Sequence, residues 1–411
     1  NNKNYQTLHL SNIESNYTYE KAQKVSQNAE LVAGFLEKNA QENDVYYKKH
    51  KILLAVGKEQ KDKIFRRFQE IKTLFPKIKL LTKKEILELE PLINKKRNQD
   101  SVLAAIYSPD GYAIDYGKLS KLFLKLSTNK TKQKNLTKKK LTIQLNTIVK
   151  KIDYDAAKEC YKLTLRVKNS IDTSTETYIH SKVLLVAAGA HSLILAKRLG
   201  IGKNLGILPV SGSFFRTNRK LLNGKVYTLQ QKKLPFAAIH GDPHVNNPNE
   251  TRFGPTARVL PILEKYNWKT VPDFLRTSAF TISGILSLFK IISDKTIFLY
   301  TIRNMFYDLP IIGKRLFLKE IKKIVPSISL DDLDYSRGIG GIRPQIVDTD
   351  TKKLVMGQGK LYGANAIFNI TPSPGASNCL ANAKEDAIKL RSYFGPSYHF
   401  DQKKFQIDHK R

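Results

Sequence analysis

The stretch VLLVAAGAHSLILAKRLG, residues 183–200, decides the fold class. Its apolar first half is typical of a strand buried on both faces of a parallel sheet, and the pattern of 192–199 predicts that a helix follows at once. Gly189 allows a sharp turn between the two elements, and Ser192 is placed to cap the helix. Such a junction lets the backbone approach a flat cofactor, although any α/β protein contains turns of this kind.

A second stretch, FNITPSPGASNCLANAKEDA at residues 368–387, has a related pattern. Pro374 and Gly375 lead into a helix predicted from Ala376 to about residue 392. The N-terminus of a helix offers free N–H donors and the positive end of its dipole, which suits an anionic group. A capped helix without a ligand is the alternative.

Outward from these junctions, periodicity predicts helices at 19–38, 62–75, 83–90 and 117–126, with Thr82 and Glu85 forming a capping box for the third. Strands are predicted at 44–47 and 51–56, on either side of a Lys-Lys-His turn, and at 141–152, 161–167 and 178–188. We interpret 127–140 as a solvated, lysine-rich loop and 263–333 as mostly helical. Alternating strands and helices with a helical insert indicate an α/β fold of two interleaved lobes.

The composition narrows the possible partners. The 411 residues include 70 Lys plus Arg against 36 Asp plus Glu, a formal net charge of +34. Such a charge is typical of proteins that bind nucleic acid or anionic membranes. Here Lys, Asn and Ile are abundant along the whole chain, so a general compositional bias explains the basic charge without any partner. No RNA- or DNA-binding motif accompanies the charge. We therefore expect no nucleic-acid partner. Two cysteines exclude a disulfide framework, and the most apolar run, 279–289, is about half the ~20 residues that cross a bilayer.

Candidate polar residues gather in the segment 234–261, where His240 and His244 flank Gly-Asp-Pro and Arg252 and Arg258 follow. Histidine is the usual general base near neutral pH, and arginine binds carboxylates through paired hydrogen bonds. The segment is therefore a candidate substrate site, with an ordinary surface loop as the alternative. Pro243 argues against a helical zinc pair, so we expect no metal.

Arg343 lies on a glycine-rich turn, GIGGIRPQIVD at 338–348, that leaves room for a ligand; an exposed hairpin arginine is the alternative. The glycine clusters at 200–206, 338–344 and 357–363 lack the G-x-G-x-x-G spacing of a phosphate-binding loop. If a dinucleotide binds, we expect its main phosphate loop to lie outside this sequence.

Several segments, in order along nearly the whole chain, closely resemble the FAD-dependent malate:quinone oxidoreductase family. They are LGILPVSGSFFRT (205–217), GKVYTLQQKKLPFAAIHGDPH (224–244), TRFGPTA (251–257), LPIIGKR (309–315), GIRPQIVD (341–348) and FNITPSPGASNCLANA (368–383). The start, Asn4-Tyr5-Gln6-Thr7-Leu8-His9, is similar to the family's Asn-Ser-Gln-Thr-x-His segment beside the flavin. Tyr5, Leu10 and Ser11 depart from the family pattern, which puts the local flavin contacts in question.

The resemblance implies an FAD/NAD(P)-binding, Rossmann-like flavoprotein fold with an interleaved substrate domain. Residues 1–43, 116–205 and 336–411 would form the FAD-binding domain, and 44–115 and 206–335 an α+β substrate lobe with the helical insert. In the family a strand–GxGxxG–helix unit precedes the segment at Asn4. We therefore expect this chain to be incomplete at its start.

The implied activity is oxidation of (S)-malate to oxaloacetate in the tricarboxylic acid cycle, with electrons passing through FAD to a membrane quinone. The same chemistry on another 2-hydroxy acid, such as lactate or 2-hydroxyglutarate, and an inactive truncated relic that cannot hold FAD are the alternatives. The enzyme is expected in the cytoplasm, as a peripheral protein on the inner face of the cell membrane. The basic helical stretch 263–330 would meet anionic lipid or form an ordinary lobe surface.

Site residues follow from the same resemblance. His240 is the first candidate for the catalytic base and His9 the second, and Arg343, with Arg252 secondarily, would bind the substrate carboxylates. Gly375 and the helix after it would stabilise the charge of the reduced flavin. Residues expected to contact FAD are Asn4, Gln6, Thr7, Val149, Gly189, Gly341, Pro374, Gly375 and Ala376.

Overall fold

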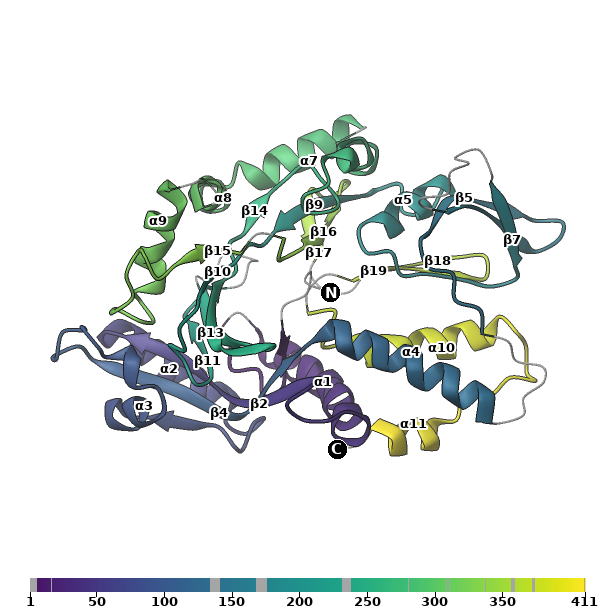
Figure 1. The fold of residues 1–411 in the computed structure, drawn as a ribbon. Helices are drawn as coiled ribbons and strands as arrows, with labels where there is room; N and C mark the ends of the chain where they lie inside the picture. The colour runs from purple at the N-terminus through teal and green to yellow at the C-terminus, as the bar shows by residue number, and fades with distance from the viewer. Residues whose placement is uncertain are drawn as a thin grey trace.

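Four β-sheets organise the described part of the chain, and helices lie around them (Figure 1). The computed structural model describes residues 6–15, 17–133, 141–167, 176–230, 238–279, 281–307, 309, 311–336, 338–355, 359–371, 374–409 and 411. Strands and helices alternate along most of these residues, which confirms the predicted mixed α/β class.

The largest sheet has the strand order β1-β4-β2-β11-β12-β13-β10-β15, with β3 paired to β4. Its strands are β1 (Thr7–Leu8), β2 (Tyr46–Val56), β3 (Lys79–Leu81), β4 (Leu103–Ile114), β10 (Phe215–Thr217), β11 (Lys225–Thr228), β12 (His240–His244), β13 (Asn247–Gly254) and β15 (Asp334–Tyr335). β11 runs parallel to β2, and the other pairs are antiparallel. The sheet thereby brings together residues that are far apart in the sequence, such as Lys225 and Lys51, which are 174 positions apart.

β2 is one strand where two were predicted. It pairs with β4 from Tyr46 opposite Ile114 to Val56 opposite Leu103, and a bulge between Lys49 and Lys51 takes the place of the predicted turn. The polar Lys-Lys-His segment between two strand-like runs is compatible with a bulge as well as with a turn. The prediction of a turn was wrong because the chain continues through this segment in the same direction.

Three smaller sheets complete the strands. The first is β14 (Arg258–Val259), β9 (Leu205–Ser211), β16 (Ile342–Asp348) and β17 (Lys353–Val355); the second is β18 (Gly359–Gly363), β19 (Ala366–Ile370) and β8 (Leu184–Val186); the third is β5 (Thr147–Asp155), β6 (Cys160–Val167) and β7 (Thr177–Ser181). The strand predicted at 178–188 is thus divided between β7 and β8, which belong to different sheets.

β8 runs parallel to β19, as the apolar run at 183–188 predicted. It is shorter than expected, however, and the side chain of Leu185 is 43% exposed, so burial on both faces was wrong. Ser192 does not cap the following helix, because its hydroxyl accepts a hydrogen bond from the N–H of Ala188 at 2.9 Å and so closes the turn before it.

The helices are α1 (Tyr19–Asn39), α2 (Lys58–Ile71), α3 (Lys83–Leu89), α4 (Tyr116–Gln133), α5 (His191–Arg198), α6 (Val271–Phe274), α7 (Ile282–Ile292), α8 (Lys295–Tyr307), α9 (Ile312–Ile321), α10 (Cys379–Ser392) and α11 (Gln402–His409). The capping box of Thr82 and Glu85 on α3 is confirmed. α4 continues to Gln133, into the predicted loop, whose residues 134–140 lie outside the described ranges. α10 begins at Cys379, after a turn at 374–378, and not at Ala376.

The helical insert packs on the largest sheet through α9. Phe317 is fully buried, stacks on Phe215 of β10 at 4.6 Å between ring centroids, and meets Tyr307 of α8 edge-on at 5.2 Å. Among the described residues, no individual helix has the length and apolar content to cross a bilayer. A pair of helical segments is long and apolar enough when taken together, but the two segments meet at a bend of 106°. They are Trp268–Ser278 and Ile282–Ile292.

Candidate functional site

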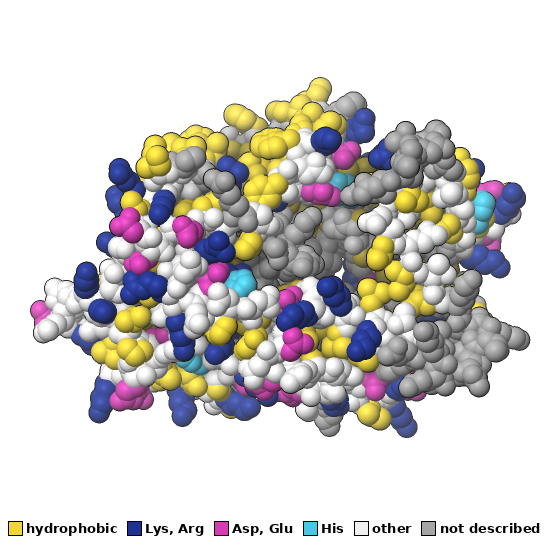
Figure 2. Space-filling model, viewed as in Figure 1, with side chains coloured by type: hydrophobic (Ala, Val, Ile, Leu, Met, Phe, Trp, Pro, Cys, Tyr) yellow, Lys and Arg dark blue, Asp and Glu magenta, His cyan; other side chains and the backbone are white. Residues whose placement is uncertain are grey.

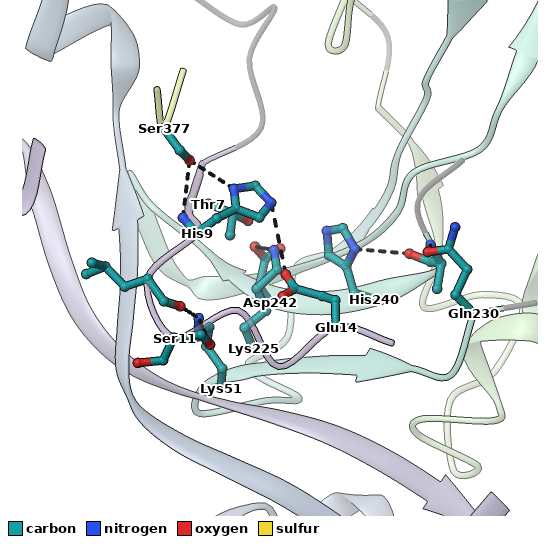
Figure 3. A network of polar contacts seen from close by, with 12 residues as sticks. Thr7, His9, Ser11, Glu14, Lys51, Lys225, Gln230, His240, Asp242 and Ser377 are labelled. Carbon is teal, nitrogen blue, oxygen red and sulfur yellow. Dashed lines mark hydrogen bonds and ion pairs between the residues drawn. The ribbon is translucent and has the colours of Figure 1, made fainter. Parts of the chain in front are cut away.

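A cluster of polar side chains lies where β1, β2, β11 and β12 come together (Figure 3). It consists of His9 and Glu14, which follow β1, Lys51 of β2, Lys225 of β11, and His240 and Asp242 of β12. His9 is partly buried and the others are buried. Burying ionisable groups costs free energy unless they are paired, and a concentration of them is typical of a functional site.

Asp242 is the anion that joins this cluster. Its carboxylate accepts hydrogen bonds from Nζ of Lys225 at 2.9 Å, from Nε2 of Gln6 at 3.0 Å and from Nη2 of Arg252 at 3.4 Å. Burial opposes ionisation, but the charges of Lys225 and Arg252 outweigh it and hold the pKa of Asp242 well below its ordinary value. Asp242 is therefore ionised and keeps two cations in the site.

His240 uses one ring nitrogen and leaves the other available. Its Nδ1 lies 3.2 Å from the carbonyl oxygen of Ala238, so Nδ1 carries the proton and donates it (Figure 3). Its Nε2 is buried and has no hydrogen-bond partner among the described residues. Burial, followed by the charge of Lys225, lowers the pKa of His240 well below 6.5. The neutral ring thus presents a lone pair on Nε2, which is the form that a general base requires.

His9 has a different tautomer. The hydroxyl of Ser377 accepts a hydrogen bond from the backbone N–H of His9 at 3.2 Å and lies 2.9 Å from its Nδ1. A carboxylate oxygen of Glu14 lies 4.0 Å from Nε2, and its negative charge favours the ring proton on that nitrogen, which leaves Nδ1 to accept from Ser377. Burial is the main reason that the pKa of His9 falls to about 4, so this ring is neutral as well.

Lys51 holds the segment after β1 against the sheet. Its ammonium group donates hydrogen bonds to the carbonyl oxygens of Leu10 and of Ser11, the latter at 3.1 Å. Burial lowers the pKa of Lys51 to about 8. Burial alone would raise the pKa of Glu14, but His9 and Lys51 lower it, so Glu14 stays ionised.

The two arginines predicted to bind carboxylates reach the cluster from different strands. Arg252 of β13 is 4% exposed; its guanidinium lies 4.9 Å from the centre of the Phe214 ring, and its Nε has no hydrogen-bond partner among the described residues. Arg343 of β16 is partly buried, and its charge adds to burial in lowering the pKa of His9. Arg252 is therefore part of the cluster through its contact with Asp242, and Arg343 influences the charge state of His9.

The charges of this site do not cancel. Its cations are Lys51, Lys225, Arg252 and Arg343, and its anions are Glu14 and Asp242. Four cations and two anions leave these side chains with a formal charge of +2. Since both histidines are neutral, the excess positive charge suits a ligand with two carboxylates.

The carboxyl ends of β8 and β19 form a second part of the site. β8 is followed by Gly189 and α5, and β19 by Gly375 and α10, so two helices begin at one edge of a parallel pair. Gly189 has φ +60°, and a side chain there would meet no atom within 4 Å. An open glycine turn and helix N-termini at this edge fit the phosphates and ring of a dinucleotide.

Ser377 connects the two parts. It lies in the turn at 374–378, directly after Pro374, Gly375 and Ala376, and contacts His9 (Figure 3). The turn before α10 is therefore in direct contact with the polar cluster, and closeness of the two parts is what reaction between a cofactor and a substrate requires.

The other residues predicted to contact the cofactor near the start have specific positions. Asn4 lies outside the described residues. The amide of Gln6 is engaged by Asp242 and by the backbone of Pro243 and Val245. Thr7 is buried and pairs with Ala113 of β4. The side chain of Gln6 therefore holds Asp242 in place.

Val149 and Gly341 complete the predicted set. Val149 of β5 is partly buried against the hydrophobic cluster that contains Leu184 and Val186 of β8. The carbonyl oxygen of Gly341, just before β16, accepts a hydrogen bond from the N–H of Gly212 at 3.3 Å. Contact of either residue with a cofactor stays a prediction.

Sequence reasoning does not single out Glu14, Lys51, Lys225 or Asp242. The signal that could find the lysines is their place beside apolar strand residues, as in KILLAV at 51–56 and KVYT at 225–228. A lysine buried in a sheet needs a partner, so each implies a nearby anion or carbonyl group. Within the described ranges, no group of three or more His, Cys, Asp or Glu residues could hold a metal ion.

Comparison with known proteins gives a consistent result. A family model described as malate:quinone oxidoreductase (Mqo) matches residues 2–382. A probable malate:quinone oxidoreductase of Campylobacter jejuni is 38% identical over 409 residues, which cover 97% of this chain and 87% of that protein. A malate:quinone oxidoreductase of Helicobacter pylori is 36% identical over 411 residues, covering 97% and 86%.

Solved structures share the fold at lower identity. Glycine oxidase from Geobacillus kaustophilus matches with a TM-score of 0.59 at 15% identity, over 96% of this chain and 84% of that one. L-α-glycerophosphate oxidase from Mycoplasma pneumoniae, solved with FAD bound, has a TM-score of 0.59 at 18% identity, over 95% and 84%. These matches confirm the predicted Rossmann-like flavoprotein fold.

Proposed function

The chain belongs to the malate:quinone oxidoreductase family, and from that premise we propose how its residues act in the reaction. It is an FAD-dependent enzyme that oxidises malate to oxaloacetate and passes the electrons to a quinone. The observation that carries the assignment of roles is the neutral His240, whose Nε2 is unpartnered among the described residues and lies in a site with excess positive charge.

His240 is the general base of this proposal. Its Nε2 takes the proton of the C2 hydroxyl as the hydride leaves C2, and the carbonyl of Ala238 stabilises the resulting imidazolium through Nδ1–H. His9 is less suited, because its Nε2 faces the carboxylate of Glu14 and its Nδ1 is engaged by Ser377. We assign His9 to positioning the turn before α10 against the substrate.

Arg343 and Arg252 bind the two carboxylates of malate. Arg252 is already paired with Asp242, which fixes the plane of its guanidinium and leaves Nε for a ligand. Arg343 reaches the site from β16 on another sheet, so the two groups can hold a four-carbon diacid at both ends. A monocarboxylate would leave part of the excess charge unpaired, which favours malate over lactate.

Gly189, Pro374, Gly375 and Ala376 would hold FAD, since they border the open edge of β8 and β19. The cofactor would supply the hydride acceptor and the electron transfer to the quinone. The positive end of the α10 dipole would favour the negative charge of the reduced flavin at this edge.

The test compares variants of the holoenzyme in malate oxidation with a soluble dye as acceptor. His240→Gln should lower kcat by about 10²–10⁴-fold with an unchanged flavin spectrum, whereas the matched variant His244→Gln, on the same strand, should be near wild type. Arg343→Ala should lower kcat/KM by roughly 10–100-fold, mostly through KM. Normal malate turnover by His240→Gln or by Arg343→Ala would reject the corresponding role.

The quinone acceptor also requires contact with a membrane, because respiratory quinones are dissolved in the bilayer. We therefore place the enzyme on the cytoplasmic face as a peripheral protein. After cell lysis at low salt, dye-linked malate oxidation should sediment with membranes, and in sealed spheroplasts the enzyme should resist external protease. Activity that remains in the supernatant at low salt would contradict this location.

A further inference from the structure

α7 carries apolar side chains on both of its faces. The outward stripe has the spacing i, i+3, i+4, i+7 and consists of Ile282, Ile285, Leu286 and Phe289, which are 79, 53, 47 and 71% exposed. On the inner face Ile291 packs in a buried cluster of the lobe with Leu288 against it, and the hydroxyl of the fully buried Ser287 donates to the carbonyl oxygen of Ser283 at 2.6 Å. A helix that covers a water-soluble lobe keeps its outward face polar.

α8 repeats this pattern. Its outward side chains are Phe298, Leu299, Ile302, Met305 and Phe306, exposed by 37–56%. Inward, Ile297 packs against the same buried cluster as α7, and Oδ1 of the buried Asn304 accepts a hydrogen bond from the N–H of Ala257 at 2.7 Å. Two consecutive helices therefore present apolar stripes to the outside in addition to the side chains that attach them to the lobe.

The stripes join into one surface, which we call the apolar crest: the outward stripes of α7 and α8 together with Leu309, Ile311 and Ile312 at the start of α9. Figure 2 shows hydrophobic side chains gathered over these helices along the upper rim of the molecule. Contiguous apolar patches of this extent are rare on water-exposed surfaces and mark sites of interaction.

Basic side chains border the crest. Lys290 and Lys295 are exposed at the junction of α7 and α8, and Arg315 is exposed on α9. The acidic side chain at the same junction, Asp294, is used by the chain itself, because its carboxylate accepts hydrogen bonds from Thr296 N–H at 2.9 Å and Ile297 N–H at 3.1 Å. The border is thus complementary to anionic lipid headgroups.

The inner side of α8 packs on the sheet that carries Arg343. Ile297 and Tyr300 lie against the buried cluster that contains Val210 of β9 and Val347 of β16, the strand of Arg343. The crest therefore lies on the outer side of a helix whose inner side covers this sheet.

We propose that the apolar crest of α7, α8 and the start of α9 inserts into the cytoplasmic leaflet of the membrane and is the face through which the quinone reaches the enzyme. The inference deepens the proposed function and rests on it for the identity of the acceptor. Its main driving force is apolar insertion, with the basic border adding affinity for anionic lipid. A basic surface meeting lipid by charge alone would need no exposed Phe or Ile.

The bilayer is a better occupant than a second copy of the chain. The helices lie on the outer rim of the molecule, and the basic side chains on the border would face one another across a two-fold contact. Anionic headgroups remove that repulsion, and the substrate that must reach this face is itself dissolved in lipid.

The experiment uses the holoenzyme and vesicles of phosphatidylcholine, with or without phosphatidylglycerol. Ile285→Ser/Phe289→Ser on the crest should weaken vesicle binding by about 100-fold, since each lost apolar side chain is worth roughly tenfold. Phe65→Ser/Leu124→Ser is the matched control, because these side chains are 51 and 43% exposed on α2 and α4, away from the crest. Lys290→Gln/Lys295→Gln should lose only the extra affinity for phosphatidylglycerol.

Activity separates the two proposals. Malate oxidation with a soluble dye should be unchanged in the crest variant, whereas oxidation with a quinone embedded in the vesicles should fall with binding. The docking proposal is overturned if the crest variant binds both vesicle types like the wild type. It is also overturned if the crest variant keeps wild-type vesicle binding and changes only the oligomeric state, from dimer to monomer, because the crest would then be an interface between two copies of the chain. Crest-dependent binding by a wild-type enzyme that does not oxidise malate would reject the function and leave docking intact.

Discussion

Replacing Asp242 by asparagine tests whether charge holds the buried cluster together. Asparagine keeps the shape of the side chain but leaves Lys225 and Arg252 buried without their counterion. Breaking a buried ion pair in this way costs about 3–5 kcal/mol. The control is the exposed ion pair of Asp44 and Lys118, whose charged groups are 2.7 Å apart and whose side chains are 56 and 42% exposed. Asp44→Asn should lower the free energy of unfolding by only about 0–1 kcal/mol.

Urea denaturation followed by circular dichroism measures both variants. Because the pKa of Asp242 is lower in the folded protein than its unfolded value of about 3.9, its contribution is present above that pH and is lost as the pH falls toward the folded pKa. The difference between wild type and Asp242→Asn should therefore shrink between pH 5 and pH 3. A loss below about 1 kcal/mol at pH 7, or a difference that does not change with pH, would refute the reasoning.

Two further predictions concern the base and the core. Because burial holds the pKa of His240 well below 6.5, log(kcat/KM) of the wild type for malate should not fall between pH 7.5 and pH 6.5. A fall of log(kcat/KM) on the acid side with its midpoint at pH 6.5 would contradict the assignment of His240 as the base. Phe317→Ala should lower the free energy of unfolding by about 3–5 kcal/mol, because Phe317 is fully buried. Phe65→Ala should lower it by less than about 0.5 kcal/mol, because Phe65 is 51% exposed. Equal losses of the two variants in urea denaturation would show that burial does not determine the loss of stability.

Elements with a local signal could be predicted from the sequence. The helix at 19–38 and the capping box of Thr82 and Glu85 depend on residues three or four apart, and the structure confirms both. The bulge in β2 could not be predicted, because it depends on pairing with β4, which lies far along the chain. The same holds for the exposed Leu185, since burial of β8 depends on which elements cover it. The role of Ser192 was missed for a different reason, since its hydroxyl has two local uses, capping the helix or accepting from the N–H of Ala188, and the sequence does not distinguish them.

The site was predictable only in part. The segment at 234–261 indicated His240 and Arg252, and the glycine-rich stretch at 338–348 indicated Arg343, whereas His9 comes from the resemblance to a family. The structure brings His9, His240 and Arg252 into one polar cluster. The partner of Arg252 was not evident, because Asp242 lies in the sequence between two prominent histidines. The outward stripes of α7 and α8 were also missed, since periodicity shows that a helix has an apolar face but not which side that face points to.

The pairing of β8 with β19 has a consequence for how the enzyme is made. These strands are separated by roughly 180 residues, so at ribosomal rates of about 5–20 residues per second the edge of β8 must wait on the order of 10 seconds for its partner to be synthesised. The edge that Gly189 and Gly375 border is complete only after β19 has emerged. With the flavin held at this edge, as proposed, its loading follows the synthesis of β19, and a nascent chain stalled before Ala366 should not retain the cofactor.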